Sequence, residues 1–226
     1  MIRLQNVSKS FEGALVLDDV SFEVPTGGTL GLVGEGGAGK SLALKVVCGL
    51  VRPDSGRVWV DDDEVSALSE TALMPVRARI GMVFQNFALF DYLDVAGNIA
   101  FPLEQLGGTP PEEVEARVRR RLEQVHLPGI AHLMPAELSG GMKKRVCLAR
   151  ATIHDPPILL CDDPTAGLDP VTTNRIFRLL KQLQAETGAT AIIVSHEVGY
   201  LKPICDDFVL LEQGRTADAS AFLSAS

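Results

Sequence analysis

The chain has 226 residues, enough for one sizeable hydrophobic core but hardly for two independent domains. Its composition, 46% hydrophobic and 22% charged, is that of a globular protein. The formal net charge of −8 argues against a nucleic-acid-binding protein, which usually carries a basic face.

Two further features bear on the cellular compartment. The four cysteines are scattered, without the paired spacing of a zinc site or a redox dithiol, which fits a reducing cytosol. The first residues lack the apolar segment of a signal peptide, and no apolar run approaches the roughly 20 residues that a membrane-spanning helix needs. We therefore expect a cytoplasmic protein, which would serve a membrane only as a peripheral subunit.

Short apolar runs alternate with helical patterns, which predicts an α/β fold with a largely parallel sheet. The first thirty residues and residues 56–60 alternate like antiparallel strands. Residues 29–33 form a predicted buried strand that ends at Gly34. Residues 41–48 then form a predicted helix that ends at Gly49.

From about residue 87 to residue 150 the pattern becomes helical. Thr109 begins a Thr-Pro-Pro-Glu sequence that matches a capping box. Apolar side chains then line one face of the following helix, namely Val114, Val118, Leu122 and Val125. We predict a helical subdomain, residues 87–150, inserted into a core of residues 1–86 and 151–226 that includes the antiparallel strands.

The last third of the chain contains two further predicted strands, residues 158–160 and 191–194, with a helix between them. Asp169 is expected to cap this helix, Pro170 suits its first turn and Gly188 ends it. The Ala/Ser-rich end, from residue 217 onward, predicts a short helix or a frayed tail.

Between the first buried strand and its helix lies a segment that fits the P-loop pattern G-x-x-x-x-G-K-[ST]. It consists of Gly34, Glu35, Gly36, Gly37, Ala38, Gly39, Lys40 and Ser41. Its glycines let backbone N–H groups converge on phosphate oxygens at the positive end of the helix dipole. Lys40 would reach the β- and γ-phosphates, and the Ser41 hydroxyl can ligate Mg²⁺. A glycine-rich structural turn is the alternative, but the strand before and the helix after favour a nucleoside triphosphate site.

A second anion site is predicted in the segment Leu138-Ser139-Gly140-Gly141-Met142. Ser139 and the two glycines open a helix whose first N–H groups have no partner within the helix. Taken alone, a plain Ser-capped helix start explains these residues equally well.

Polar residues also follow the later strands. Asp162 and Asp163 follow the apolar run 158–160, and His196 follows the run 191–194. Parallel sheets bind ligands at the carboxyl ends of their strands, which favours a functional role for His196. A lone histidine at a strand end is nevertheless more often structural.

In this order, the segments resemble the motifs of ABC ATPases, and the resemblance covers essentially the whole chain. It implies a P-loop NTPase cassette with a RecA-like core, an antiparallel β subdomain and an inserted α-helical subdomain. It also implies that ATP is bound with Mg²⁺ and hydrolysed.

The resemblance assigns roles to single residues. Asp162 would hold Mg²⁺, and Gln85 would contact Mg²⁺ and water while joining the core to the helical subdomain. His196 occupies the position of the family's switch histidine, which contacts the γ-phosphate. Phe11 matches the aromatic residue that stacks on adenine, although a phenylalanine considered alone is more often buried core.

The same resemblance implies a homodimer. In such a dimer two head-to-tail chains trap two nucleotides, each between Lys40 of one chain and the Ser139, Gly140 and Gly141 segment of the other. Asp169 would lie in the loop that crosses the interface, besides capping its helix.

Asp163 departs from the family, which normally has glutamate at the position that polarises the attacking water. The reference pKa values of Asp and Glu differ by only about 0.4 unit, so base strength is not the issue. The carboxylate is drawn back by roughly one C–C bond, and misplacements of about 1 Å can cost on the order of 10²-fold in rate. We expect slow but real hydrolysis; a cassette that binds ATP without cleaving it is the alternative.

A narrower resemblance rests on residues 82–91, 98–103 and 134–145, which include the Met142 of the second anion site. These segments resemble ATPases of the mammalian-cell-entry and maintenance-of-lipid-asymmetry type. That type implies lipid transport across the bacterial envelope and a peripheral position on the inner face of the cell membrane. The implied partners are a membrane permease, an envelope lipid-binding protein and a small regulatory subunit.

Three alternatives remain open at this point. An ABC ATPase for another cargo, such as an amino acid or an ion, would carry the same motifs. A soluble ABC protein of translation or DNA repair is less consistent with a single cassette and a negative net charge. The apolar segment 87–90 fits a groove for a permease helix, or else ordinary core of the helical subdomain.

Overall fold

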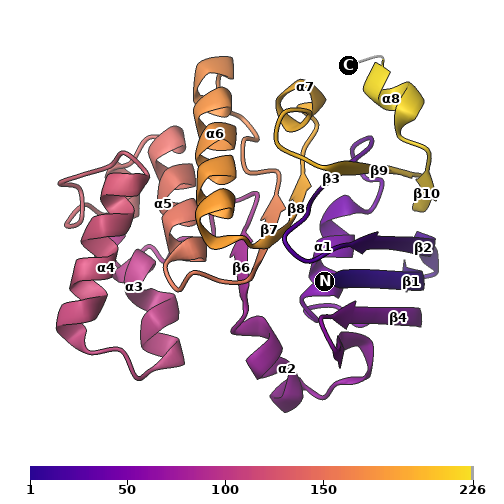
Figure 1. Cartoon of the computed structure of the whole chain (residues 1–226), viewed down its shortest axis with the longest axis horizontal. Helices are drawn as coiled ribbons and strands as arrows, with labels where there is room; N and C mark the ends of the chain where they lie inside the picture. The colour runs from indigo at the N-terminus through magenta and orange to yellow at the C-terminus, as the bar shows by residue number, and fades with distance from the viewer. Residues whose placement is uncertain (225–226) are drawn as a thin grey trace.

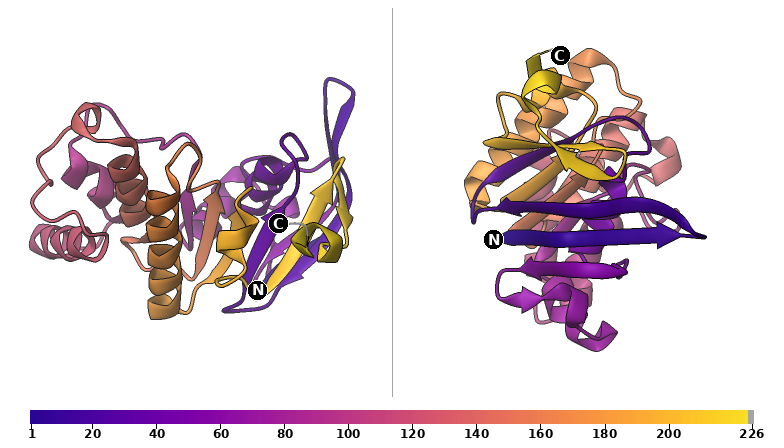
Figure 2. Two further views of the ribbon diagram at one scale, coloured as in Figure 1. Left: turned by 90° about the horizontal axis from the view of Figure 1, so that it is seen from above. Right: turned by 90° about the vertical axis from the view of Figure 1, so that its right-hand side faces the viewer.

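Two β-sheets and a group of helices make up the molecule, which is shown in Figure 1 as a computed structural model that describes residues 1–224. The larger sheet lies in the middle, the smaller sheet on one side and helices α3, α4 and α5 on the other. The left view in Figure 2 shows the same separation along the long axis. The fold therefore contains the predicted α/β core, antiparallel sheet and helical group, whereas the domain boundaries near residues 86 and 150 stay predictions.

The larger sheet has the strand order β10-β9-β3-β8-β7-β6. All neighbouring pairs from β9 to β6 are parallel, and only β10 runs antiparallel to its neighbour. Residues in β3, β7 and β8 are buried throughout, as expected for strands covered on both faces. The strands are β3 (Thr29–Val33), β6 (Ile80–Val83), β7 (Ile158–Asp162), β8 (Thr190–Val194), β9 (Asp207–Glu212) and β10 (Arg215–Ala217).

The smaller sheet is antiparallel, with the order β2-β1-β4-β5. Helix α1 (Lys40–Val47) packs between the two sheets, because its buried side chains belong to a cluster shared by both. The antiparallel pattern predicted for the first thirty residues and residues 56–60 is confirmed. The strands are β1 (Ile2–Phe11), β2 (Ala14–Val24), β4 (Ser55–Val60) and β5 (Asp63–Glu64).

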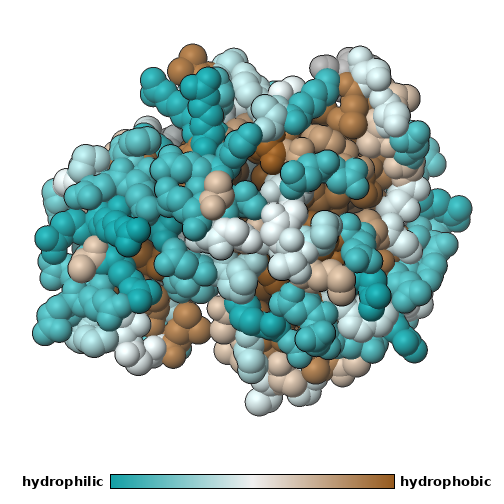
Figure 3. Space-filling model, in the orientation of Figure 1, coloured by the Kyte–Doolittle hydropathy of each residue, from teal (hydrophilic) through white to brown (hydrophobic). Residues whose placement is uncertain are grey.

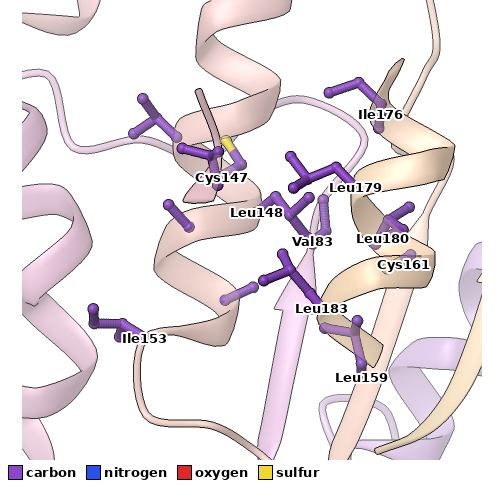
Figure 4. Packing of buried hydrophobic residues seen from close by; sticks show 14 of the residues in the cluster. Val83, Cys147, Leu148, Ile153, Leu159, Cys161, Ile176, Leu179, Leu180 and Leu183 are labelled. Atoms are coloured by element: carbon purple, nitrogen blue, oxygen red, sulfur yellow. The ribbon is translucent and has the colours of Figure 1, made fainter. Parts of the chain in front are cut away.

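The other face of the larger sheet is covered by α5 and α6. Figure 4 shows Leu148 of α5 and Leu179 and Leu183 of α6 meeting Val83 and Leu159 of the sheet. Polar residues dominate the outer surface over the helices at the left of Figure 3. The α-helices are α2 (Glu70–Arg77), α3 (Val95–Leu106), α4 (Pro111–Gln124), α5 (Gly140–Thr152), α6 (Pro170–Thr187), α7 (Val198–Leu201) and α8 (Ser220–Ser224), and the 3₁₀-helices are η1 (Val65–Ala67) and η2 (Pro135–Glu137).

The ends of α6 are those the sequence predicts. Asp169 accepts hydrogen bonds from the N–H groups of Val171 and Thr172, both at 3.0 Å. Gly188 follows the helix with a φ of 64°, the left-handed conformation that glycine adopts easily. Both termini of this helix are thus determined by local chemistry.

The capping box predicted for α4 is wrong. The residue before this helix is Pro110 rather than Thr109, and Pro110 supplies no side-chain cap. A residue before proline avoids the helical region, so Pro111 holds Pro110 extended and starts the helix one residue later than the capping box requires. Glu112 and Glu113 place negative charge in the first turn instead.

The predicted helical stretch from residue 87 to residue 150 contains α3, α4 and most of α5, but residues 125–139 are irregular apart from η2. The predicted C-terminal helix is α8, and residues 225–226 lie outside the described part. Within residues 1–224, no helix is both long and apolar enough to cross a bilayer.

Candidate functional site

The P-loop, residues 34–41, connects β3 to α1 in a conformation that requires glycine. The φ angles of Gly34 and Gly39 are 139° and 98°. A Cβ on Gly34 would run into the backbone of Leu211, and one on Gly39 would lie 2.9 Å from the Val16 carbonyl oxygen. The loop is therefore packed against β9 on one side and against β2 on the other.

The middle of the P-loop is open instead of packed. A Cβ placed on Gly36 or Gly37 would meet no atom within 4 Å. The first N–H groups of α1 have no partner within the helix, and its first residues, Lys40, Ser41 and Leu42, line this space. The loop thus forms a cradle of the kind that binds phosphate groups.

Lys40 is buried beneath this cradle. Its ammonium donates hydrogen bonds to the carbonyl oxygens of Gly34 at 2.7 Å and Glu35 at 2.6 Å. Burial lowers the pKa of Lys40 from its ordinary value, against the opposing effect of Asp163 and Asp162. The cation is held by backbone oxygens that it can exchange for phosphate oxygens.

Ser41 and Asp162 form a small oxygen site beside the P-loop. The Ser41 hydroxyl donates to a carboxylate oxygen of Asp162 at 2.7 Å, although the two residues are 121 positions apart in the chain. Mg²⁺ in phosphoryl-transfer sites is usually held by one or two such oxygens together with substrate phosphates. This pair fits Mg²⁺, whereas no group of three or more His, Cys, Asp or Glu side chains within residues 1–224 is arranged to hold a metal alone.

Asp163 follows β7 directly and is almost fully buried. Its φ of 43° lies in the left-handed region, which Asp tolerates better than most residues, and its N–H donates to the Val194 carbonyl at 3.0 Å. Burial raises the pKa of its carboxyl, while His196, Lys144 and Lys40 act in the opposite direction. The carboxyl is thus fixed at the end of the sheet with little water around it.

His196 lies on the next strand end, with a side chain that is 52% exposed. Its Nε2 is 3.8 Å from a carboxylate oxygen of Asp163. The two side chains therefore face the same space from the carboxyl ends of β7 and β8.

One pocket of about 310 Å³ brings most of the predicted residues together. It lies where β3, β6, β7 and β8 end. Its lining consists of Gly36, Gly37, Ala38, Gly39, Lys40, Ser41, Leu42, Gln85, Asp162, Asp163, Val194 and His196. A glycine-rich backbone, a lysine cation, a hydroxyl–carboxylate pair that fits Mg²⁺ and three polar side chains that can orient water thus surround one cavity.

Phe11 lies outside this lining, at the end of β1. Its side chain is 48% exposed, and the Lys9 ammonium lies 5.5 Å from the ring centroid. The same hairpin supplies Val16 and Leu17, which contact the P-loop at Gly39. An exposed ring at this place favours the base-stacking interpretation over ordinary core.

The second anion site does not join the pocket within one chain. Ser139 caps α5, where its Oγ accepts from the Met142 N–H at 3.3 Å, and both Ser139 and Gly140 are exposed. Asp169 is also exposed, and its bonds to Thr172 lower the pKa of its carboxyl. Among the described residues that line the pocket, none comes from 139–141 or 169.

The sequence interpretation missed one residue at this site, Lys144. Its side chain is only 1% exposed, and its ammonium donates to the Gln85 carbonyl at 2.7 Å and the Asp163 carbonyl at 3.3 Å. The neighbours Lys143 and Arg145 make the segment look like an exposed charged face. Only the contacts of α5 with the loop after β6 distinguish Lys144 from them.

Comparisons with known proteins agree with this geometry. The family model described as ABC transporter matches residues 17–166. Two curated relatives are methionine import ATP-binding proteins MetN. The one from Carboxydothermus hydrogenoformans is 44% identical over 221 residues, covering 96% of this chain and 65% of the relative. The one from Caulobacter vibrioides is 43% identical over 223 residues, covering 98% and 67%. The chain thus spans about two thirds of the length of these relatives.

Solved structures are similar over nearly the full chain. The dimeric, post-hydrolysis state of the ATP-binding cassette MJ0796 bound to ADP and Pi has a TM-score of 0.90 at 32% identity, covering 96% of this chain and 97% of that one. The structure of cbiO1 from Clostridium perfringens, part of the ABC transporter complex cbiONQ, has a TM-score of 0.87 at 28% identity, covering 99% and 91%.

Proposed function

Because this chain belongs to the ABC transporter family and has the fold of its ATP-binding cassettes, we propose that it is the ATP-hydrolysing subunit of a membrane importer and works as a homodimer. The observation that carries the proposal is the pocket that joins the P-loop to Gln85, Asp162, Asp163 and His196. These residues come from four separate parts of the chain, and each supplies a function that ATP hydrolysis needs.

The P-loop and Lys40 bind the phosphate groups of ATP. Lys40 gives up its bonds to the Gly34 and Glu35 carbonyls and donates to phosphate oxygens instead. Ser41 and Asp162 hold Mg²⁺, which neutralises charge on the phosphates when bound. Phe11 stacks on the adenine ring from the adjoining hairpin.

Asp163, His196 and Gln85 orient the attacking water. The Asp163 carboxylate accepts a hydrogen bond from that water, and His196 contacts the γ-phosphate from the neighbouring strand. Because the buried Asp163 carboxyl has a raised pKa, it holds a proton more readily than an exposed aspartate does. The short Asp side chain makes hydrolysis slower than a glutamate would.

A second copy of the chain completes each nucleotide site. Ser139 and Gly140 lie exposed at the start of α5, outside the pocket of their own chain. The related cassette MJ0796 is dimeric in its structure with ADP and Pi. A head-to-tail pair of this chain therefore places the start of α5 over the phosphates bound by the partner, with Asp169 near the interface.

An apolar groove beside the pocket is the proposed docking site for the permease. It has a volume of about 720 Å³ and lies where α2, β6, α3 and α5 meet. Phe90 and Phe101 line it with ring centroids 4.6 Å apart. Phe87 does not line it, because this residue sits in a left-handed turn and packs against the core. The groove interpretation is therefore kept for Phe90 and dropped for Phe87.

Methionine or a related amino acid is the first candidate cargo, since the curated relatives described above are methionine import proteins. A lipid is the second candidate, supported by Met142 and the segments that resemble lipid-transport ATPases. In either case the cassette lies peripherally on the cytoplasmic face of the membrane with a permease. An envelope-side binding protein and a small regulatory subunit belong to the lipid candidate only.

Two experiments test these proposals. The purified chain should hydrolyse ATP only with Mg²⁺, and Lys40→Ala should abolish the activity; hydrolysis that survives this change would refute the assigned site. For the cargo, the co-purified complex is reconstituted in proteoliposomes. ATP-dependent uptake of radiolabelled methionine supports the first candidate, whereas transfer of fluorescent phospholipid without methionine uptake supports the second.

A further inference from the structure

One face of α5 donates hydrogen bonds to the segment that follows β6. This segment, residues 85–88, is called the Gln85 loop below. Lys144 donates to the Gln85 carbonyl at 2.7 Å, Cys147 to the Phe87 carbonyl at 3.0 Å, and Arg150 to the carbonyls of Phe87 and Ala88 at 3.0 and 2.5 Å. Because the three donors are spaced three residues apart, they lie along one side of the helix.

The Gln85 loop needs these bonds because its backbone is strained. Phe87 and Ala88 have φ angles of 59° and 52°, and both carry a Cβ. Two successive residues of this kind in the left-handed region persist only where the surroundings hold them. The donors of α5, together with the packing of Phe87 against the core, supply that restraint.

Lys144 differs from the other two donors because it also reaches the hydrolytic site. Its ammonium donates to the Asp163 carbonyl at 3.3 Å and lies 5.0 Å from the Phe87 ring centroid. It is 1% exposed and has neutral partners rather than a paired carboxylate. Burying an ammonium in this way is unfavourable, and an apolar side chain would fill the same space at lower cost.

The part of α5 that follows Lys144 is firmly packed on the sheet. Figure 4 shows Leu148 beside Val83 of β6 and Leu179 of α6, so the helix is packed on the sheet just beyond Lys144. A side chain that projects from this firmly packed helix can fix the distance between two loops at the end of the sheet. Lys144 joins the loop after β6 to the first residue after β7.

We propose that Lys144 is a positioning residue, which ties the Gln85 loop to the Asp163 segment so that Gln85 and the Asp163 carboxylate keep one fixed relative position. This proposal rests on the proposed ATPase function. Arg150 holds the same loop and also lines the apolar groove.

The test compares three variants of the full chain. Lys144→Met removes the donor and keeps an unbranched apolar side chain, and Lys144→Arg keeps the charge and the donors. Lys143→Met is the matched control, since it removes a lysine from the adjacent, more exposed position of the same helix. Two quantities are measured: amide hydrogen exchange of residues 84–90 and 163–168 without nucleotide, and the steady-state kcat and KM for Mg-ATP.

Lys144→Met should raise amide exchange in both segments by about tenfold and lower kcat by about ten- to a hundredfold, with KM changed less than threefold. Lys144→Arg should recover most of the kcat, and Lys143→Met should match the wild type in both measurements. A Lys144→Met protein with wild-type kcat, or with exchange raised uniformly along the chain, overturns the proposal.

Two further outcomes are separable from these. If Lys144→Met does not fold, it is replaced by Lys144→Gln, whose side chain has a donor but is too short to bridge both carbonyls. An unchanged kcat in Lys144→Gln overturns the proposal. If the wild-type chain hydrolyses no Mg-ATP, the proposed function fails. The exchange measurement then still decides whether Lys144 ties the two segments, because it needs no nucleotide.

Discussion

The length of the side chain at position 163 should determine the rate of hydrolysis. Asp163 is held at the end of β7 by its N–H bond to the Val194 carbonyl, and its carboxylate is 3.8 Å from His196. Asp163→Glu extends the carboxylate by about one C–C bond toward the pocket. Since a misplacement of about 1 Å can cost roughly 10²-fold, restoring the reach should raise kcat by about ten- to a hundredfold.

The backbone opposes this gain only weakly. The φ of 43° is tolerated better by Asp than by Glu, since Asp is several-fold enriched in the left-handed region. A several-fold preference corresponds to about 1 kcal/mol, which lowers stability but does not act on the rate directly. Asp19→Glu is the matched control, because Asp19 has a φ of 56° and lies exposed away from the pocket.

The assay is steady-state release of phosphate from Mg-ATP, with a thermal melt of each variant. We expect Asp163→Glu to be faster and Asp163→Asn to be at least a hundredfold slower, with similar loss of stability in Asp163→Glu and Asp19→Glu. An unchanged rate in Asp163→Asn would remove Asp163 from the mechanism. A slower Asp163→Glu would show that the position is adapted to the short side chain.

Four more outcomes follow from the structure. Because burial raises the pKa of Asp163, the folded chain favours the protonated carboxyl, and this stabilisation is lost as the pH rises through the raised pKa. Asp163→Asn should therefore melt at a higher temperature than the wild type at pH 7. At a pH below 3.8, the ordinary aspartate pKa, the two proteins should melt at the same temperature. Phe90→Asp should leave the ATPase rate of the isolated chain unchanged and abolish transport by the reconstituted complex, and normal transport would contradict the groove assignment. Ser139→Glu should prevent ATP-dependent dimerisation in light scattering, because its charge would face the partner's phosphates. Leu148→Ala should lower the free energy of unfolding by about 2–5 kcal/mol in urea titrations, since this side chain is fully buried between α5 and the sheet.

Much of the core could be predicted because local sequence determined it. The strands β3, β7 and β8 are fully buried, so their apolar runs are continuous and easily recognised. The caps of α6 depend on Asp169 and Gly188 alone. The P-loop could likewise be recognised from its own glycines, Lys40 and the two elements that flank it.

Other features depend on contacts between distant segments. The start of α4 was misplaced because two prolines in succession allow either a capping box or an extended residue before the helix. The sequence places Phe87 in the groove because no local signal reveals that its left-handed turn is held by donors about sixty residues later in α5. Lys144 was missed for the same reason, since its burial depends on where α5 meets the Gln85 loop.

The contact between Gly39 and the β1–β2 hairpin has a further consequence for energy conversion. Because the hairpin that carries Phe11 is packed directly on the P-loop, the proposed surfaces for the base and the phosphates are assembled together within one chain. Little ordering entropy is then lost when one chain binds its nucleotide. Under the proposed function, more of the free energy released when two loaded chains close on each other would then be left for mechanical work on a permease.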